Sequence, residues 1–273
     1  MAMTGRLTDQ DELVRLANNW LAVQTYYVTY HATQAVAVSA GMTRPQQHAA
    51  TQKLFCAMWA DKPRGLAPWT LAVDAAGCRN VPPSVTLDPD VHPWSLCTAS
   101  SAWSLAAKAL RTTRDESVRD AVRVARENKK KAARKAWRAA EDVRLASGKR
   151  PRSTPQFPMP RLTTAERAVV SDKERAATLV DYLYRLRINT NYEDSAMFTD
   201  GPTAPAESTR VRRCFGILAG TTLLLCEMAI MRQLGKTQVV SWAEDWAHAN
   251  VPDGMDAGIR PRLDVLREFR DAT

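Results

Sequence analysis

One uninterrupted stretch in the middle of the chain constrains the fold most. Residues 113 to 146 contain no Pro or Gly, and Thr113 with Glu116 has the spacing of a capping box that begins a helix. The stretch therefore predicts one unbroken helix that ends before Gly148, with a separate helix before it from about Trp94 to Arg111. At 1.5 Å per residue the longer helix would measure on the order of 50 Å, which is long for a compact domain.

The same region carries most of the positive charge of the chain. From Arg114 to Arg152 there are fourteen Lys or Arg against six Asp or Glu, which is +8 of the formal net charge of +9. A charge run is usually a solvated helix face, and binding of a phosphate backbone is the alternative. Both interpretations stay open, and under the second the candidate nucleic-acid contacts are Arg119, Arg123, Arg126, Lys129, Lys130, Lys131, Arg134, Lys135 and Arg138.

The apolar side of this helix is made of small residues. Val and Ala recur at helical spacing, which predicts close packing against another helix while the basic flanks face water. The positions are Val118, Val122, Ala125, Ala132, Ala136, Ala139 and Val143.

Elsewhere the sequence predicts an all-α protein. Apolar residues make up 45% of the chain, there is no sustained period-two alternation, and capping residues with helical periodicity recur. Capping boxes are expected at Thr163 with Glu166 and at Ser171 with Glu174. Further helices are expected at about 8–41, 46–59, 206–234, 238–248 and 259–270. The apolar run Ile217 to Met231 would be buried on most of its circumference as the central core helix.

Residues 61 to 95 interrupt the helical pattern. Six prolines break any helix there, yet Trp69, Leu71 and Val73 are too apolar for a disordered linker, so we expect an ordered and packed segment. The Pro-rich run from 150 to 160 is expected to be an extended spacer.

Cofactor and membrane signals are weak. The five Cys residues stand singly, without a CxxC pair, which indicates reduced thiols and no structural metal. His92 lacks a second ligand at metal-binding spacing and is expected to be a loop residue. The start of the chain has no apolar signal-peptide core, and the run from Gly216 to Met231 contains Glu227 and is shorter than a membrane span. We expect a soluble cytoplasmic protein without cofactor, metal or membrane partner.

The residues from Asp181 to Asp194 are the favoured functional segment. Arg187, Asn191 and Asp194 fall on one side of a helix at spacings of four and three, behind a core face that includes Leu183. A structural arginine paired to a neighbouring element is the alternative for Arg187. In the first helix a second stripe combines aromatic and polar residues, namely Trp20, Gln24, Tyr27, His31 and Gln34. A histidine in such a seam is more often structural than catalytic.

Three sequence motifs resemble a known family. The segments YYVTYHATQAVAVSAG (26–41) and LYRLRINTNYED (183–194), with His48 opening the second helix, are similar to the HEPN family of prokaryotic helical domains. The resemblance implies a four- or five-helix bundle, commonly a homodimer, formed by residues 1–60 and 161–273 with 61–160 as an insertion. The family includes metal-independent ribonucleases of toxin, CRISPR and phage-defence systems, whose signature is Arg followed four to six residues later by His.

This chain departs from that signature, because Tyr192 stands where the family has His. Metal-free RNA cleavage needs a base, an acid and a cation. Arg187 could be the cation, but a Tyr with an ordinary pKa near 10 is a poor base at neutral pH. The resemblance then leaves His31 and His48 as the candidates for proton transfer. The candidate catalytic residues are Arg187, Tyr192, His31 and His48, and the candidate site lining is Tyr27, Asn191 and Asp194.

Two functional hypotheses follow. The first is an RNA-directed protein of a bacterial defence or toxin-antitoxin type system that uses the Arg187 site and holds nucleic acid on the basic helix. The second is a non-catalytic scaffold or antitoxin-like subunit, in which the helical bundle mediates assembly and the long helix binds a protein partner. The sequence leaves both hypotheses open.

Overall fold

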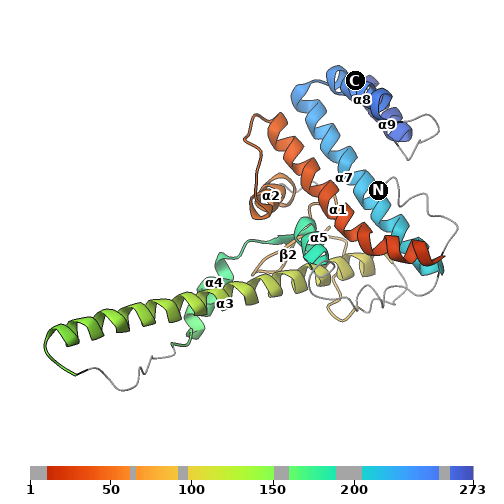
Figure 1. The fold of residues 1–273 in the computed structure, drawn as a ribbon. Helices are drawn as coiled ribbons and strands as arrows, with labels where there is room; N and C mark the ends of the chain where they lie inside the picture. The colour runs from red at the N-terminus through yellow and green to blue at the C-terminus, as the bar shows by residue number, and fades with distance from the viewer. Residues whose placement is uncertain are drawn as a thin grey trace. The chain divides into compact units, whose positions relative to one another are not determined.

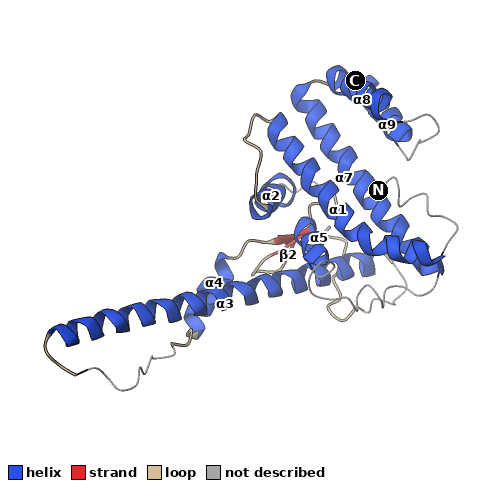
Figure 2. Cartoon of the chain, viewed as in Figure 1, coloured by secondary structure: helices blue, strands red, loops and turns tan. Residues whose placement is uncertain are grey.

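The computed structural model describes residues 11–61, 66–91, 98–150, 160–188, 205–251 and 259–272. These residues are mostly helical (Figure 2), so the predicted all-α class is confirmed at the level of secondary structure. The chain divides into two compact units, residues 1–64 with 179–273 and residues 65–178. The segment 161–178, which the sequence analysis grouped with the bundle, belongs to the second unit.

The first unit is built on two long helices that lie side by side (Figure 1). They are α1 (Asp11–Ser39) and α7 (Pro205–Leu234). Three further helices pack on this pair: α5 (Leu179–Ile188) on α1, and α8 (Lys236–Asn250) and α9 (Ile259–Asp271) on α7. The helix α2 (His48–Phe55), followed by a π-helical turn at Cys56–Ala60, contacts α1 and α5.

Three threonines one turn apart are buried along α1, and two of them form hydrogen bonds with the helix itself. Thr25, Thr29 and Thr33 are fully buried. The hydroxyls of Thr29 and Thr33 donate to the carbonyl oxygens four residues earlier, at 3.0 and 2.7 Å. Because the helix itself accepts these hydrogen bonds, short polar side chains occupy buried positions without a partner from another element.

The second unit combines one very long helix with a small sheet. In the sheet, β1 (Ala72–Val73) pairs antiparallel with both β2 (Cys78–Arg79) and β3 (Ala177–Thr178), and α3 (Ala99–Ala146) packs against β1 and β3. Leu71 and Val73 are buried, as is Leu110 of α3, which confirms for residues 66–91 the ordered, packed segment expected between residues 61 and 95. The short helix α4 (Thr164–Lys173) contacts α3.

The long helix differs from the prediction at its start. It begins at a capping box between Thr98 and Ser101 and continues through residues 111–113, where the sequence analysis placed a break. Its 48 residues span on the order of 70 Å. Thr113 is buried, and its hydroxyl donates to the carbonyl oxygen of Ala109 at 2.8 Å. The predicted capping box at Thr113 was therefore wrong, because Thr113 lies buried inside the helix and its hydroxyl bonds the preceding turn.

The two other predicted capping boxes had different outcomes. Thr163 and Glu166 form the reciprocal box that begins α4, as predicted. The box at Ser171 and Glu174 was wrong, because Ser171 lies inside α4 and Glu174 ends that helix.

The helix α7 is less covered than expected. Ala219 and Met231 are buried, but Ile217 is 58% exposed, so burial on most of the circumference was wrong. The helix from Ala206 to Leu234 is also long and apolar enough to cross a membrane by length and composition, contrary to the shorter span expected from its sequence. Glu227 within it pairs with Arg262 of α9 at 3.2 Å. Burial raises the pKa of Glu227, while Arg262 favours its charged form.

Candidate functional site

Arg187 lies among aromatic rings of the first unit. Its guanidinium carbon is 5.3 Å from the ring centre of Tyr27, 5.7 Å from Tyr184 and 5.8 Å from Tyr26. Cation–π attraction of this kind stabilises a desolvated guanidinium. The Nε atom of Arg187 is buried and has no hydrogen-bond partner among the described residues. Arg187 as a whole is partly exposed and has no ion-pair partner among the described residues, which favours binding of an anion by its guanidinium.

His48 opens α2 and contacts the same cluster. Its ring centre lies 4.9 Å from that of Tyr30 and 5.3 Å from that of Tyr184. The Nδ1 atom is 2.5 Å from the hydroxyl oxygen of Tyr26, which is fully buried. Burial, with the nearby Tyr184, raises the pKa of Tyr26 far above its ordinary value, so this hydroxyl stays protonated. We therefore assign Tyr26 as the donor and Nδ1 of His48 as the acceptor, which leaves the proton of the neutral ring on Nε2.

The protonation state of His48 follows from its surroundings. Burial and the positive charge of Arg187, in that order, lower the pKa of His48 below its ordinary value. The ring is therefore neutral at pH 7. It brings an Nε2–H donor to the cluster that holds Arg187 and not a second positive charge.

In His31 the Nδ1 atom is the donor and not the acceptor, and the hydrogen bonds of Gln34 show this. Gln34 donates from Nε2 to the carbonyl oxygen of Pro45 at 2.6 Å, and its Oε1 accepts from Nε of Arg44 at 3.1 Å. These partners set the amide orientation, so the Nδ1 atom of His31, 3.3 Å from Oε1, must be the donor. In the neutral ring Nε2 is then unprotonated, and because His31 is exposed this lone pair is open to a substrate.

The two histidines thus belong to one cluster. The ring of His31 stacks on Tyr27 at 6.0 Å and meets Tyr30 edge-on at 5.2 Å, and Tyr30 also contacts His48. We call Arg187, the three rings around it and the three rings that contact them the Arg187 cluster; the rings are Tyr26, Tyr27 and Tyr184, and then Tyr30, His31 and His48. It contains an exposed imidazole, a neutral N–H donor and a guanidinium, which are the kinds of group that can promote displacement at a phosphodiester.

The structure brings together four of the candidates taken from the sequence: Arg187, His31, His48 and Tyr27. Tyr192, Asn191 and Asp194 lie outside the described residues, as does His92. The sequence analysis did not single out Tyr26, Tyr30 and Tyr184 as site residues. Tyr26 and Tyr30 are one helical turn apart, and this spacing was the available signal.

The predicted nucleic-acid contacts on α3 fall into two groups. Four of them have an acidic partner: Arg119 with Glu116, Arg123 with Asp120, Lys129 with Glu166 and Lys130 with Glu127. Arg134 also has an interaction partner. Four others are exposed and lack an ion-pair partner within the described parts of the chain, namely Arg126, Lys131, Lys135 and Arg138. Lys131, Lys135 and Arg138 share one side of the helix at spacings of four and three, and we call them the basic face.

The small-residue side of α3 is covered over part of its length. Val118, Val122 and Ala125 are half-buried in the region that contacts α4, where Arg114 donates to the carbonyl oxygen of Ser171 at 2.9 Å. From Ala132 onward the same side is exposed at most positions, and Val143 is 72% exposed. Close packing along the whole side was therefore wrong for the described residues, because α4 is too short to reach the outer half.

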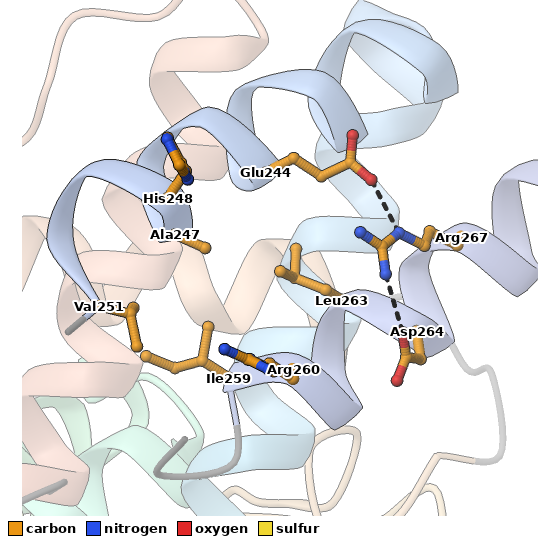
Figure 3. Close-up of a pocket in the computed structure, with 9 residues that line it drawn as sticks. All are labelled: Glu244, Ala247, His248, Val251, Ile259, Arg260, Leu263, Asp264 and Arg267. Carbon is orange, nitrogen blue, oxygen red and sulfur yellow. Dashed lines mark hydrogen bonds and ion pairs between the residues drawn. The ribbon is translucent and has the colours of Figure 1, made fainter. Parts of the chain in front are cut away.

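A hollow lies between α8 and α9 and has a volume of about 590 Å³. Figure 3 shows Glu244 of α8 and Arg267 of α9 pointing toward each other across it. Arg267 bonds Glu244 at 2.7 Å and Asp264 at 2.9 Å. These charges satisfy one another, and the hollow contains none of the candidate residues, so the Arg187 cluster remains the stronger candidate.

Among the described residues, no group of three or more His, Cys, Asp or Glu side chains lies close enough together to hold a metal ion. Comparisons with protein-family models, with curated proteins and with solved structures found no match. The functional assignment of this chain therefore depends on the chemistry of the Arg187 cluster and of α3.

Proposed function

We propose that this chain is an RNA-directed, HEPN-like protein of a bacterial defence or toxin-antitoxin type system and that it cleaves RNA without a metal ion. One observation carries the proposal. His31 and His48 each have Nδ1 engaged by the protein, as a donor in His31 and as an acceptor in His48, so in the neutral rings one presents an Nε2 lone pair and the other an Nε2–H within the cluster that holds the Arg187 guanidinium.

The reaction needs no further group from the described residues. The Nε2 atom of His31 takes the proton of the RNA 2′-hydroxyl, whose oxygen attacks the adjacent phosphorus. Arg187 and the Nε2–H of His48 stabilise the negative charge on the phosphoryl oxygens. The bond from phosphorus to the 5′ oxygen breaks, and this oxygen takes a proton from water. The hydroxide that forms takes the proton held on His31, and the products are a 2′,3′-cyclic phosphate and a 5′-hydroxyl.

The basic face supports a role in holding the nucleic acid. Lys131, Lys135 and Arg138 are exposed and lack ion-pair partners within the described part of α3. Such side chains bind phosphates with little sequence preference and in a salt-dependent way.

The direct test uses labelled RNA incubated with purified protein in the presence of a metal chelator. Wild-type protein should release products with cyclic phosphate ends, and Arg187→Ala should abolish this release while its circular dichroism remains that of the wild type. Absence of cleavage by the wild type, or an active Arg187→Ala variant, would falsify the proposal.

The resemblance also implies a homodimer, in which the α5 helix that bears Arg187 meets its symmetry mate. Light scattering at micromolar concentration should then give twice the mass of the 30.3 kDa chain. A monomer under these conditions would argue against this part of the proposal.

A non-catalytic scaffold is the second candidate, and one observation favours it. The outer half of the small-residue side of α3 is exposed, with Ala132, Ala136 and Val143 open to a partner helix. Under this alternative, Ala136→Glu would block assembly with a protein partner, whereas substitutions at Arg187 would leave the function intact.

A further inference from the structure

An exposed tryptophan lies on the same face of α1 as the candidate base. Trp20 is 58% exposed, Tyr27 is partly exposed and His31 is exposed. The spacings of seven and four residues place the three side chains on one side of the helix. At 1.5 Å per residue, Trp20 lies roughly 10 Å along the axis from Tyr27, within reach of a nucleotide adjacent to the cluster.

Packing among the described residues gives no reason for this exposure. Trp59 and Trp69 pack their rings in the interior, at 5% and 9% exposed. An exposed indole leaves a large apolar surface in contact with water, which burial against a ligand would remove. Trp242 and Trp246 of α8 are exposed to a similar degree, but α8 contributes nothing to the Arg187 cluster. Among the described tryptophans, exposure coincides with the candidate site at Trp20.

The charge of Arg187 and the position of Tyr27 on α1, between Arg187 and Trp20, indicate which kind of ligand would bind this face. Tyr27 links Trp20 to the site, because its ring contacts both His31 and the guanidinium of Arg187. A ligand that spans the face must offer an anion to Arg187 and a flat apolar group to Trp20. A single strand of RNA has both in every nucleotide, whereas the bases of a duplex are already stacked on one another.

We propose that Trp20 is a stacking platform for an unpaired base next to the phosphate bound at Arg187. This inference rests on the proposed function. Trp20 touches the substrate away from the reacting atoms, so it sets affinity and strand preference.

The experiment measures binding of a fluorescein-labelled RNA whose 2′-hydroxyls are all methylated. Such RNA keeps its bases and phosphates but lacks the nucleophile, so binding is measured apart from cleavage. The single strand and its duplex are each titrated with wild type, Trp20→Ala, Trp20→Phe and the matched control Trp242→Ala. Raised salt weakens the phosphate contacts of α3 and leaves stacking as the larger contribution.

For the single strand, Trp20→Ala should weaken affinity by about fivefold or more, the usual contribution of one stacked base. Trp20→Phe should keep most of the affinity, and Trp242→Ala should bind as the wild type does. Duplex affinity should be the same for wild type and Trp20→Ala.

Unchanged single-strand affinity of Trp20→Ala, in a protein that cleaves RNA, would overturn this inference and leave the proposed function standing. An equal loss in Trp242→Ala or for the duplex would also overturn it, as would a change in molecular mass of Trp20→Ala in light scattering, since Trp20 would then serve a protein contact. A wild type that neither binds nor cleaves RNA would overturn both proposals.

Discussion

The Arg187 cluster and the outer half of α3 both present positive charge, but they hold it in different ways. In the cluster one guanidinium is fixed within 6 Å of three rings, and each histidine has one ring nitrogen engaged. On α3 the side chains of Lys131, Lys135 and Arg138 extend into solvent. Fixed groups with assigned protons suit chemistry at one bond, whereas mobile exposed charges suit attraction of a polyanion.

The largest effect is expected from removing the proposed base, which tests whether the Arg187 cluster is the reacting site. His31→Ala should lower the rate of RNA cleavage by about 10² to 10⁴, because positioned proton transfer contributes that much. His31 is exposed, so the fold should not change. Initial rates with labelled RNA measure the effect, and His248→Ala is the matched control, since His248 is an exposed histidine of α8. If both variants lose activity equally, the cluster is not the reacting site.

The basic face provides the second prediction. Replacing Lys131, Lys135 and Arg138 with Gln should reduce the salt dependence of nucleic-acid affinity by roughly two to three units of slope, because each phosphate that is no longer neutralised accounts for about 0.7 to 0.9. Glutamine keeps good helix propensity, so folding should survive. A salt titration with labelled RNA or DNA measures the slope.

A lysine of α3 that forms an ion pair gives the control for that experiment. Lys129 bonds Glu166 of α4 at 2.7 Å. Lys129→Gln should therefore change the slope less than the triple variant does, because part of its charge is already neutralised. A wild type that binds no nucleic acid even at low salt would refute the role of α3 and favour the scaffold alternative.

The sequence predicted the helices well because Gly and Pro mark their ends. The turn at Gly41, with φ +76°, and the end of α7 at Gly235, with φ +97°, lie where the sequence indicated. The small sheet escaped prediction, since each strand has two residues and period-two alternation needs more. The turn between β1 and β2 is stabilised by Asp74, whose carboxylate accepts from the backbone N–H groups of Ala76 and Gly77.

The sequence could predict several residues of the candidate site but not which ring nitrogen of each histidine carries the proton. His31, His48 and Arg187 came from the sequence and the resemblance it carries. The role of each histidine depends on contacts across the turn after α1, where Arg44 and Pro45 orient Gln34. Helical spacing on a single element cannot reveal such contacts between elements.

The third prediction isolates the hydrogen bond that sets His48. Tyr26→Phe keeps the fully buried ring but removes the donor to Nδ1, and should lower the free energy of unfolding by about 1 kcal/mol. Tyr30→Phe is the matched control, because Tyr30 is also buried but its hydroxyl has no hydrogen bond with any described residue. Urea denaturation measures both variants. An equal loss in the two would show that the hydroxyl of Tyr26 does not hold His48.

The smallest expected effect concerns acid stability. Burial and Arg187 lower the pKa of His48 below the ordinary value of 6.5, so the native state resists protonation that the unfolded chain accepts. The unfolded chain then binds more protons in the window from pH 6.5 down to the folded pKa. The free energy of unfolding therefore falls as the pH drops through this window and is fully regained above it.

His48→Gln should remove this contribution, since the Gln side chain can accept from Tyr26 but does not titrate. Melting temperatures at about pH 7.5 and 5.5, on either side of the ordinary pKa, measure the difference, which should be smaller in His48→Gln than in the wild type. His248→Gln controls for the loss of a histidine elsewhere and should keep the acid sensitivity of the wild type. Equal sensitivity in all three proteins would mean that His48 titrates alike in the folded and unfolded chain, so burial beside Arg187 would not be what keeps its ring neutral, and the contrast with the exposed charges of α3 would lose this support.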